Sequence, residues 1–225
     1  MYRRTQILAL VFAAAAAVPA LGQVQTKESQ AAMTPGKTLE LLKEGNARFL
    51  AGKPRHRDWP ADVHATAAGQ YPYVAIISCM DSRAPMEIVL DQGLGDMFGL
   101  RTAGNVIDTD FLGSLEYAVK VVGIHLVAVV GHTHCGAVKG AIDNVQLGNL
   151  TALLSKISPS VAVSGPGTSK DAAYVNKVAE QNVRHSMHDI RERSAVVREA
   201  LAAGKVGLVG GMYDIDTGKV VFSAD

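Results

Sequence analysis

Two cysteines and a histidine occupy positions from which they could hold one metal ion. Cys79 follows an apolar run at residues 74–77, and His132 and Cys135 follow a second run at residues 126–130. Both runs end abruptly in polar residues, which is typical of strands buried on both faces of a parallel sheet. If the strands are neighbours, the three side chains meet at the carboxyl edge, where open α/β sheets bind ligands. Two thiolates and one imidazole suit zinc, and an open fourth position is typical of catalytic zinc sites.

A carboxylate and a guanidinium follow the first of these strands. Asp81 and Arg83 are two residues apart, close enough for a bidentate ion pair that keeps the carboxylate ionised. Asp81 is placed either to fill the fourth ligand position or to accept a hydrogen bond from whatever occupies it. Because the arginine keeps its pKa low, Asp81 is poorly suited to be the final proton acceptor. The alternative is an ion pair with only a structural role.

The N-terminus has the features of a secretory signal peptide. Two arginines precede an apolar run at residues 7–18, and small residues follow at Ala20 and Gly22. The run is too short to span a bilayer, which takes roughly 20 apolar residues. We therefore expect residues 1–22 to be removed and the mature protein to be periplasmic or secreted, without a membrane span. An uncleaved anchor is the alternative.

Export gives the two cysteines a competing interpretation. In an oxidising compartment, Cys79 and Cys135 would by default form a disulfide, or they would be inert buried thiols. Their position beside polar strand ends favours metal binding instead.

The charge balance excludes another class of partner. Removal of residues 1–22 takes away two of the 22 basic residues and no acidic one, which leaves 20 basic and 21 acidic side chains. No basic stripe remains, so nucleic acid is not an expected partner.

Strand and helix patterns alternate along the chain and predict a single α/β domain with a central, mostly parallel sheet flanked by helices. Residues 23–36 are expected to form a flexible leader, followed by the catalytic domain at residues 37–225. An amphipathic helix at residues 34–50 is expected to act as an N-terminal arm that packs across a neighbouring subunit. The other expected elements are loops at 53–64 and 159–169, helices at 84–90, 111–122 and 137–145, strands at 97–101, 206–209, 212–215 and 220–223, and a helical stretch at 171–203 broken near His185.

Two motifs resemble the β-class carbonic anhydrases. They are Cys-Met-Asp-Ser-Arg at residues 79–83 and Gly-His-Thr-His-Cys-Gly-Ala at residues 131–137. The resemblance extends from about residue 38 to residue 142. Both motifs stand in order around the matching segment Gly-Ser-Leu-Glu-Tyr-Ala-Val at residues 113–119. It implies a parallel-sheet fold with helical arms that embrace a partner subunit.

The resemblance also implies an activity, the reversible hydration of CO₂ to bicarbonate and a proton by zinc-bound hydroxide. By resemblance, Cys79, His132 and Cys135 bind one Zn²⁺ per subunit, and Asp81 and Arg83 form the catalytic dyad. Asp81 is in addition a conditional zinc ligand, because it ligates zinc in the resting state of some family members. The pKa of zinc-bound water is about 7 in carbonic anhydrases with three histidine ligands. Two thiolates donate more charge, so a higher value is expected here.

Four further residues match the family's substrate pocket. Gln70 matches a glutamine that points into the pocket, and Phe98 and Tyr117 match aromatic pocket residues. Ala103 stands where a larger apolar residue is common, so the shape of this pocket is expected to differ. Family members build the pocket at a dimer interface, which implies a homodimer or homotetramer. Ordinary core or loop positions are the alternative for Gln70, Phe98 and Tyr117.

Other functions fit the same residues. Hydrolysis of a related heterocumulene, CS₂ or COS, is possible on the same scaffold, and so is a non-catalytic module that binds zinc or bicarbonate. The presence of both Asp81 and Arg83 disfavours the non-catalytic module. His134 lies beside the ligands and is either a proton shuttle or an ordinary polar neighbour.

Overall fold

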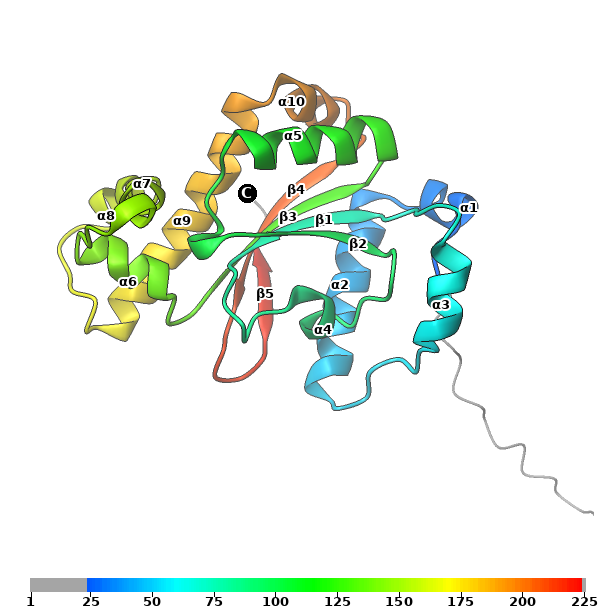
Figure 1. The fold of residues 1–225 in the computed structure, drawn as a ribbon, viewed down its shortest axis with the longest axis horizontal. Coiled ribbons are helices and arrows are strands. Elements are labelled where there is room, and N and C mark those ends of the chain that lie inside the picture. The colour runs from blue at the N-terminus through cyan, green and yellow to red at the C-terminus, as the bar shows by residue number, and fades with distance from the viewer. Residues whose placement is uncertain (1–23, 224–225) are drawn as a thin grey trace, which may run out of the picture.

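A five-stranded sheet forms the centre of the protein in this computed structural model, which describes residues 24–223 (Figure 1). The predicted signal peptide therefore lies outside the described residues. The strand order is β2-β1-β3-β4-β5, with parallel pairing except between β4 and β5, which confirms the predicted α/β fold. The strands are β1 (Val74–Ser78), β2 (Met97–Arg101), β3 (Leu126–His132), β4 (Gly207–Tyr213) and β5 (Val220–Ser223).

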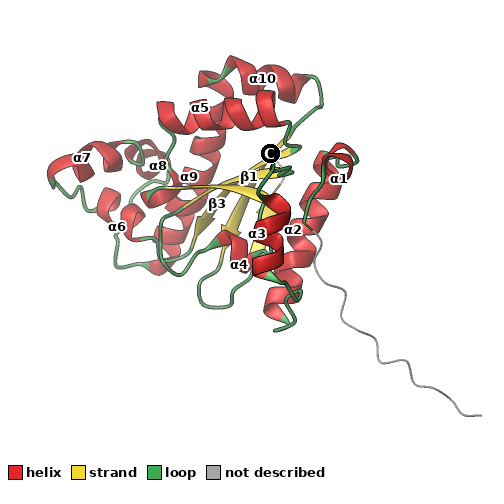
Figure 2. Cartoon of the chain, turned by 45° about the vertical axis from the view of Figure 1, so that its right-hand side comes forward, coloured by secondary structure: helices red, strands yellow, loops and turns green. Residues whose placement is uncertain are grey.

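Helices cover both faces of the sheet (Figures 1 and 2). One face carries α5 (Thr109–Tyr117), the π-helical turn η2 (Ala118–Val122), α9 (Ala172–Arg193) and α10 (Ala195–Ala202). The other face carries α2 (Pro35–Leu50) and α4 (Met86–Val89). The remaining helices are α1 (Lys27–Ala31), α3 (Trp59–Thr66), the 3₁₀ turn η1 (Ala103–Asn105), α6 (Gly136–Ile142), α7 (Gly148–Ser155) and α8 (Ser158–Val163).

The central strands are buried on both faces because side chains alternate along a strand. On β1, Ala75 and Ile77 pack in the core under α5 and α9, whereas Val74 and Ile76 pack with Leu42 of α2. All four of these apolar side chains are fully buried, as the apolar run predicted. Leu42 places α2, the predicted arm, in the core of its own chain. Contact of α2 with a partner subunit stays a prediction.

The prediction of a loop at residues 53–64 is wrong from Trp59 onward, because α3 begins there. Asp58 caps this helix, since its carboxylate accepts a hydrogen bond from the backbone N–H of Ala61 at 3.1 Å. Pro60 lies in the first turn, where a missing N–H costs no hydrogen bond. The proline that suggested a loop is thus a helix-start residue.

The helical stretch at residues 171–203 breaks at Ser194, not near His185. Ser194 has extended backbone angles, ends α9, and caps α10 by accepting a hydrogen bond from the N–H of Val197 at 3.2 Å. Serine competes with the helix ladder through such local bonds.

Three other boundaries differ from the predictions. The expected leader contains α1, whose start is held by a capping box between Thr26 and Ser29. The expected loop at residues 159–169 begins with most of α8. The two expected strands at 206–209 and 212–215 are one strand, β4, because Gly210 lets the backbone pass close under Val183 of α9. None of these changes moves the carboxyl ends of β1 and β3.

Among the described residues, no helix combines the length and the apolar composition that crossing a bilayer requires.

Candidate metal centre

The carboxyl ends of β1 and β3 lie side by side, because Ser78 at the end of β1 pairs with Val130. Cys79 directly follows β1, His132 is the last residue of β3, and Cys135 is the residue before α6. Their ligand atoms all lie within 4.8 Å of one another, and all three residues are buried. The neighbouring strands therefore bring together the three residues that the sequence separates.

His132 presents a free nitrogen to this cluster. Its Nδ1 lies 2.8 Å from the carbonyl oxygen of Thr133, which can only accept a hydrogen bond. Nδ1 therefore carries the proton in the neutral ring, and Nε2 offers a lone pair. Within the part of the chain that the structure describes, this buried Nε2 has no hydrogen-bond partner. An unpartnered buried nitrogen beside two thiols fits a bound cation, and this donor set is one that zinc prefers.

The two cysteines are free thiols, not a disulfide. The hydrogen bond from Cys135 lowers the pKa of Cys79 against the effect of burial, and the backbone N–H of Gly104 adds to this lowering. Gly104 N lies 3.3 Å from the Cys79 sulfur. The same Cys79 contact and burial raise the pKa of Cys135. The contact thus favours the thiolate form of Cys79 and the thiol form of Cys135, and a metal bound by both sulfurs would displace the remaining proton.

Asp81 and Arg83 form the bidentate pair that their spacing predicted. Arg83 Nε lies 3.0 Å from Oδ1 of Asp81, Nη2 lies 2.8 Å from Oδ2, and the backbone N–H of Arg83 also donates to Oδ1. These hydrogen bonds hold the pKa of Asp81 well below its usual range. Oδ2 of Asp81 is 3.9 Å from Nε2 of His132. The carboxylate therefore stays ionised at the edge of the cluster.

Arg101, which the sequence analysis did not single out, holds the turn between these residues. This last residue of β2 donates from Nε to the carbonyl of Cys79 at 3.1 Å and from Nη2 to the carbonyl of Asp81 at 2.6 Å. The position of Arg101 in the sequence could have identified it. It ends the second predicted strand, so its charged side chain is expected at the same edge of the sheet as Cys79.

The predicted pocket residues do not all lie at this edge. Ala103 lies in η1, beside Gly104. Gln70 precedes β1, and Phe98 pairs with Ala75 in the first half of the strands. Gln70 and Phe98 therefore lie toward the amino end of the sheet, opposite to the carboxyl end where the cysteines meet. The structure does not bring either of them to the metal ligands of the same chain.

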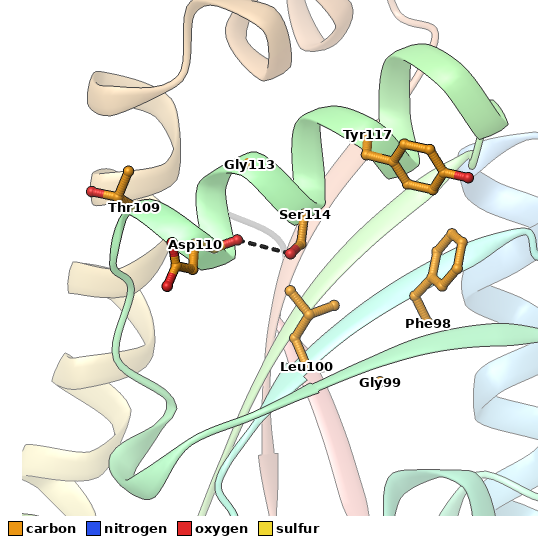
Figure 3. Close-up of a pocket in the computed structure, with 8 residues that line it drawn as sticks. All are labelled: Phe98, Gly99, Leu100, Thr109, Asp110, Gly113, Ser114 and Tyr117. Carbon is orange, nitrogen blue, oxygen red and sulfur yellow. Dashed lines mark hydrogen bonds between the residues drawn. The ribbon is translucent and has the colours of Figure 1, made fainter.

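Phe98 and Tyr117 line a surface pocket of their own (Figure 3). Their ring centroids are 6.4 Å apart, and Tyr117 is 51% exposed at the end of α5. Figure 3 shows Leu100 and Ser114 beside them, between the edge strand β2 and α5. The pocket thus lies beside β2, which is an edge strand of the sheet in the described part of the chain.

Three comparisons with known proteins agree with one another. A family model described as carbonic anhydrase matches residues 74–220. Carbonic anhydrase 2 of Mycobacterium tuberculosis is 41% identical over 186 residues, which cover 80% of this chain and 88% of the relative. The carbonic anhydrase of Mycolicibacterium smegmatis is 38% identical over 185 residues, which also cover 80% of this chain and 88% of the relative. The crystal structure of a β-carbonic anhydrase of Aspergillus fumigatus matches with a TM-score of 0.67 and 28% identity, and covers 84% of this chain and 91% of that one.

Proposed function

This chain belongs to the β-class carbonic anhydrase family, and we propose on that premise that one Zn²⁺ per subunit, held by Cys79, His132 and Cys135, serves its reaction. The reaction is the reversible hydration of CO₂ to bicarbonate and a proton. The observation that carries the zinc assignment is the buried Nε2 of His132, which faces two thiols without a hydrogen-bond partner among the described residues.

The three ligands are prepared for a cation by their surroundings. The lowered pKa of Cys79 favours its thiolate form, the raised pKa of Cys135 favours its thiol form, and metal binding to both sulfurs would release the remaining proton. The bond from His132 Nδ1 to the Thr133 carbonyl keeps Nε2 free and fixes the ring. The chemistry that a zinc ion supplies in such a site is the acidification of water, which provides hydroxide near neutral pH.

Asp81 serves as a fixed hydrogen-bond acceptor beside the ligands. Arg83 keeps its carboxylate ionised and holds both oxygens, so the carboxylate cannot rotate freely. An ionised acceptor orients an attacking oxygen by taking a hydrogen bond from it. Because its pKa is held low, Asp81 does not keep the proton, which must pass to buffer. Arg83 already binds both oxygens of Asp81, so a bound metal would have water, and not Asp81, as its fourth ligand.

The substrate pocket is completed by a second copy of the chain. Gln70, Phe98 and Tyr117 lie away from the cysteines of their own chain, so they can serve a metal centre only if a partner subunit supplies them. The edge strand β2 and the exposed Tyr117 offer the surface for this contact. A homodimer is the smallest assembly that meets this need, and a homotetramer contains it.

Export of the protein is supported by residues 1–22, which have the pattern of a signal peptide. The enzyme would then act in the periplasm or outside the cell. Mass spectrometry of the N-terminus after expression with the native leader tests this, and an intact Met1 on the mature protein would contradict it.

Zinc analysis combined with stopped-flow CO₂ hydration tests the function. The wild type should bind about one zinc per chain and hydrate CO₂. Removal of the metal with a chelator should abolish turnover, and added Zn²⁺ should restore it. Cys135→Ser should lose most of its zinc. Full zinc content in Cys135→Ser would remove that residue from the site, and hydrolysis of COS or CS₂ without CO₂ hydration would replace the proposed substrate.

A further inference from the structure

The turn that carries two of the metal ligands contains a residue with an uncommon backbone conformation. His134 lies between His132 and Cys135 and has φ of 58°, in the left-handed region. That region is uncommon for residues with a side chain, although histidine is found there more often than most. A turn of this kind persists only when neighbouring groups hold it.

Two side chains from distant parts of the chain hold His134. Its backbone N–H donates to Oδ1 of Asn176, on α9, at 3.1 Å. Its Nε2 lies 2.8 Å from Oδ2 of Asp216, in the turn between β4 and β5. The two contacts bind different atoms of the same residue, so together they fix both its backbone and its side chain.

The turn that carries Asp216 is itself fixed and tied to the metal turn. Asp214 accepts hydrogen bonds from the N–H of Asp216 and the hydroxyl of Thr217, each at 2.9 Å. Thr133 accepts a hydrogen bond from the N–H of Ile215 at 3.0 Å. The Asp216 carboxylate is nevertheless 70% exposed, so it contributes little to the core.

We propose that Asn176 and Asp216 are positioning residues of the metal centre. They hold His134 in its left-handed conformation and thereby set the distance from His132 to Cys135, which lies one residue beyond His134. This inference rests on the proposed zinc site. It assigns Asn176 and Asp216 a role through His134 and not through contact with substrate.

The first test is the affinity for Zn²⁺, measured by competition with a chromophoric chelator. Asn176→Ala and Asp216→Ala remove the two acceptors, and each should weaken zinc binding by about 10-fold to 100-fold, the usual cost of losing a group that orients a ligand. Asn176→Asp and Asp216→Asn keep an acceptor oxygen and should restore most of the affinity. Asp143→Ala, an exposed acidic residue at the end of α6, is the matched control and should leave the affinity unchanged.

The second test separates positioning from a general effect on the fold. In a His134→Gly background, the backbone adopts the left-handed conformation without strain and the bond to Asp216 is already gone. Asp216→Ala should then cause no further loss of zinc affinity, a non-additive result that marks direct coupling. A role of Asp216 through its own turn would instead give the same loss in both backgrounds, and that outcome would overturn the proposal.

Absorption of the Co²⁺-loaded protein adds a readout of geometry. The thiolate-to-cobalt band should shift in Asn176→Ala and return in Asn176→Asp. If Asn176→Ala does not fold, the zinc affinity of Asp216→Ala alone tests the proposal. The Asp216 side chain is exposed, so its removal leaves the core intact. Zinc affinities within twofold of wild type in both alanine variants would overturn this inference. The proposed function would still stand in that case if the wild type binds zinc and hydrates CO₂. A wild type that binds no zinc would overturn both.

Discussion

At the scale of single residues, the site depends on which groups carry protons before a metal arrives. The neighbouring Cys135 and the amide of Gly104 lower the pKa of Cys79 and so favour its thiolate form. His132 keeps its proton on Nδ1 because only a carbonyl lies there. Asp81 is kept charged by hydrogen bonds from Arg83. Each protonation state thus follows from one or two specific contacts.

Replacement of Asp81 by asparagine should separate metal binding from turnover. Asp81→Asn keeps the shape of the side chain and all three zinc ligands, but it replaces the negatively charged carboxylate, which accepts hydrogen bonds, with a neutral amide. Zinc content should stay near one per chain, and kcat/KM for CO₂ hydration should fall by at least ~100-fold. Asp143→Asn is the control, measured by the same stopped-flow assay. Undiminished turnover in Asp81→Asn would contradict the dyad assignment.

At the scale of elements, the turns after the strands are as important as the strands. Arg101 at the end of β2 binds the carbonyls of Cys79 and Asp81, so it fixes the turn that follows β1. Gly104 in η1 has φ of 67°, and a Cβ there would lie 2.6 Å from Cδ1 of Ile157. Only glycine lets this turn bring its N–H to the Cys79 sulfur.

Gly104→Ala should therefore cost more stability than an alanine at another left-handed glycine. Gly123 is the matched control, since its φ is 83° and nothing lies within 4 Å of a Cβ built there. Gly123→Ala should lose about 1–2 kcal/mol of unfolding free energy from backbone strain alone. Gly104→Ala adds overpacking, typically another 1–3 kcal/mol. Urea unfolding measures both, and equal losses would show that the site tolerates the methyl group.

At the scale of the whole molecule, a buried ion-pair cluster joins α2, the segment before α3 and the turn at Asp91. We propose that the β2 edge joins two subunits. The Asp91 side chain is 2% exposed and binds Arg48 of α2 at 2.5 Å and Arg57, before α3, at 2.6 Å. Burial alone would raise the pKa of Asp91, but the hydrogen bonds from Arg48 and Arg57 outweigh it and lower the pKa.

A lowered pKa makes this cluster a source of acid sensitivity. The stabilisation is fully present above the unfolded pKa of an aspartate, about 3.9, and is lost as pH falls through the lower folded value. Unfolding free energy should thus decrease below about pH 4, and Asp91→Asn should make the decrease shallower. At neutral pH, Asp91→Asn should lose about 3 kcal/mol, because it leaves buried Arg57 without its charged partner. Denaturant unfolding of the wild type and of Asp91→Asn from pH 7 to pH 2 measures the loss at neutral pH and the decrease at low pH. If the unfolding free energy falls with pH equally steeply in both proteins, Asp91 is not the source of the acid sensitivity.

The proposed subunit contact can be tested on the exposed face of α5. Ser114 lines the pocket with Phe98 and Tyr117, and Ser114→Arg places a long charged side chain there (Figure 3). Sedimentation should show a shift to monomer, with zinc retained and CO₂ hydration reduced at least ~10-fold, because each site loses the partner's pocket residues. Ser155→Arg on the exposed surface of α7 is the matched control. An active monomer would show that one chain suffices.

Much of the site could be predicted because its signals are local. An apolar run that ends in polar residues marks a buried strand and its ligand-bearing end, and this pattern located Cys79, Asp81, His132 and Cys135 before any fold was known. The order of strands and helices also predicted the parallel sheet. Short helices such as α3 were missed, because a proline in a first helical turn has the same local appearance as one in a loop.

The sequence by itself therefore determined the donor types, the strand ends that carry them and the class of fold. Only the tertiary structure decided which groups orient those donors. Asn176 and Asp216 lie 42 and 82 positions from His134, and Arg101 lies 22 positions from Cys79. Such pairs form through strand register and helix packing, which depend on the whole chain. The local pattern around Asn176 or Asp216 does not reveal its contact with His134, and the place of Arg101 at a strand end indicates only the edge of the sheet where it lies.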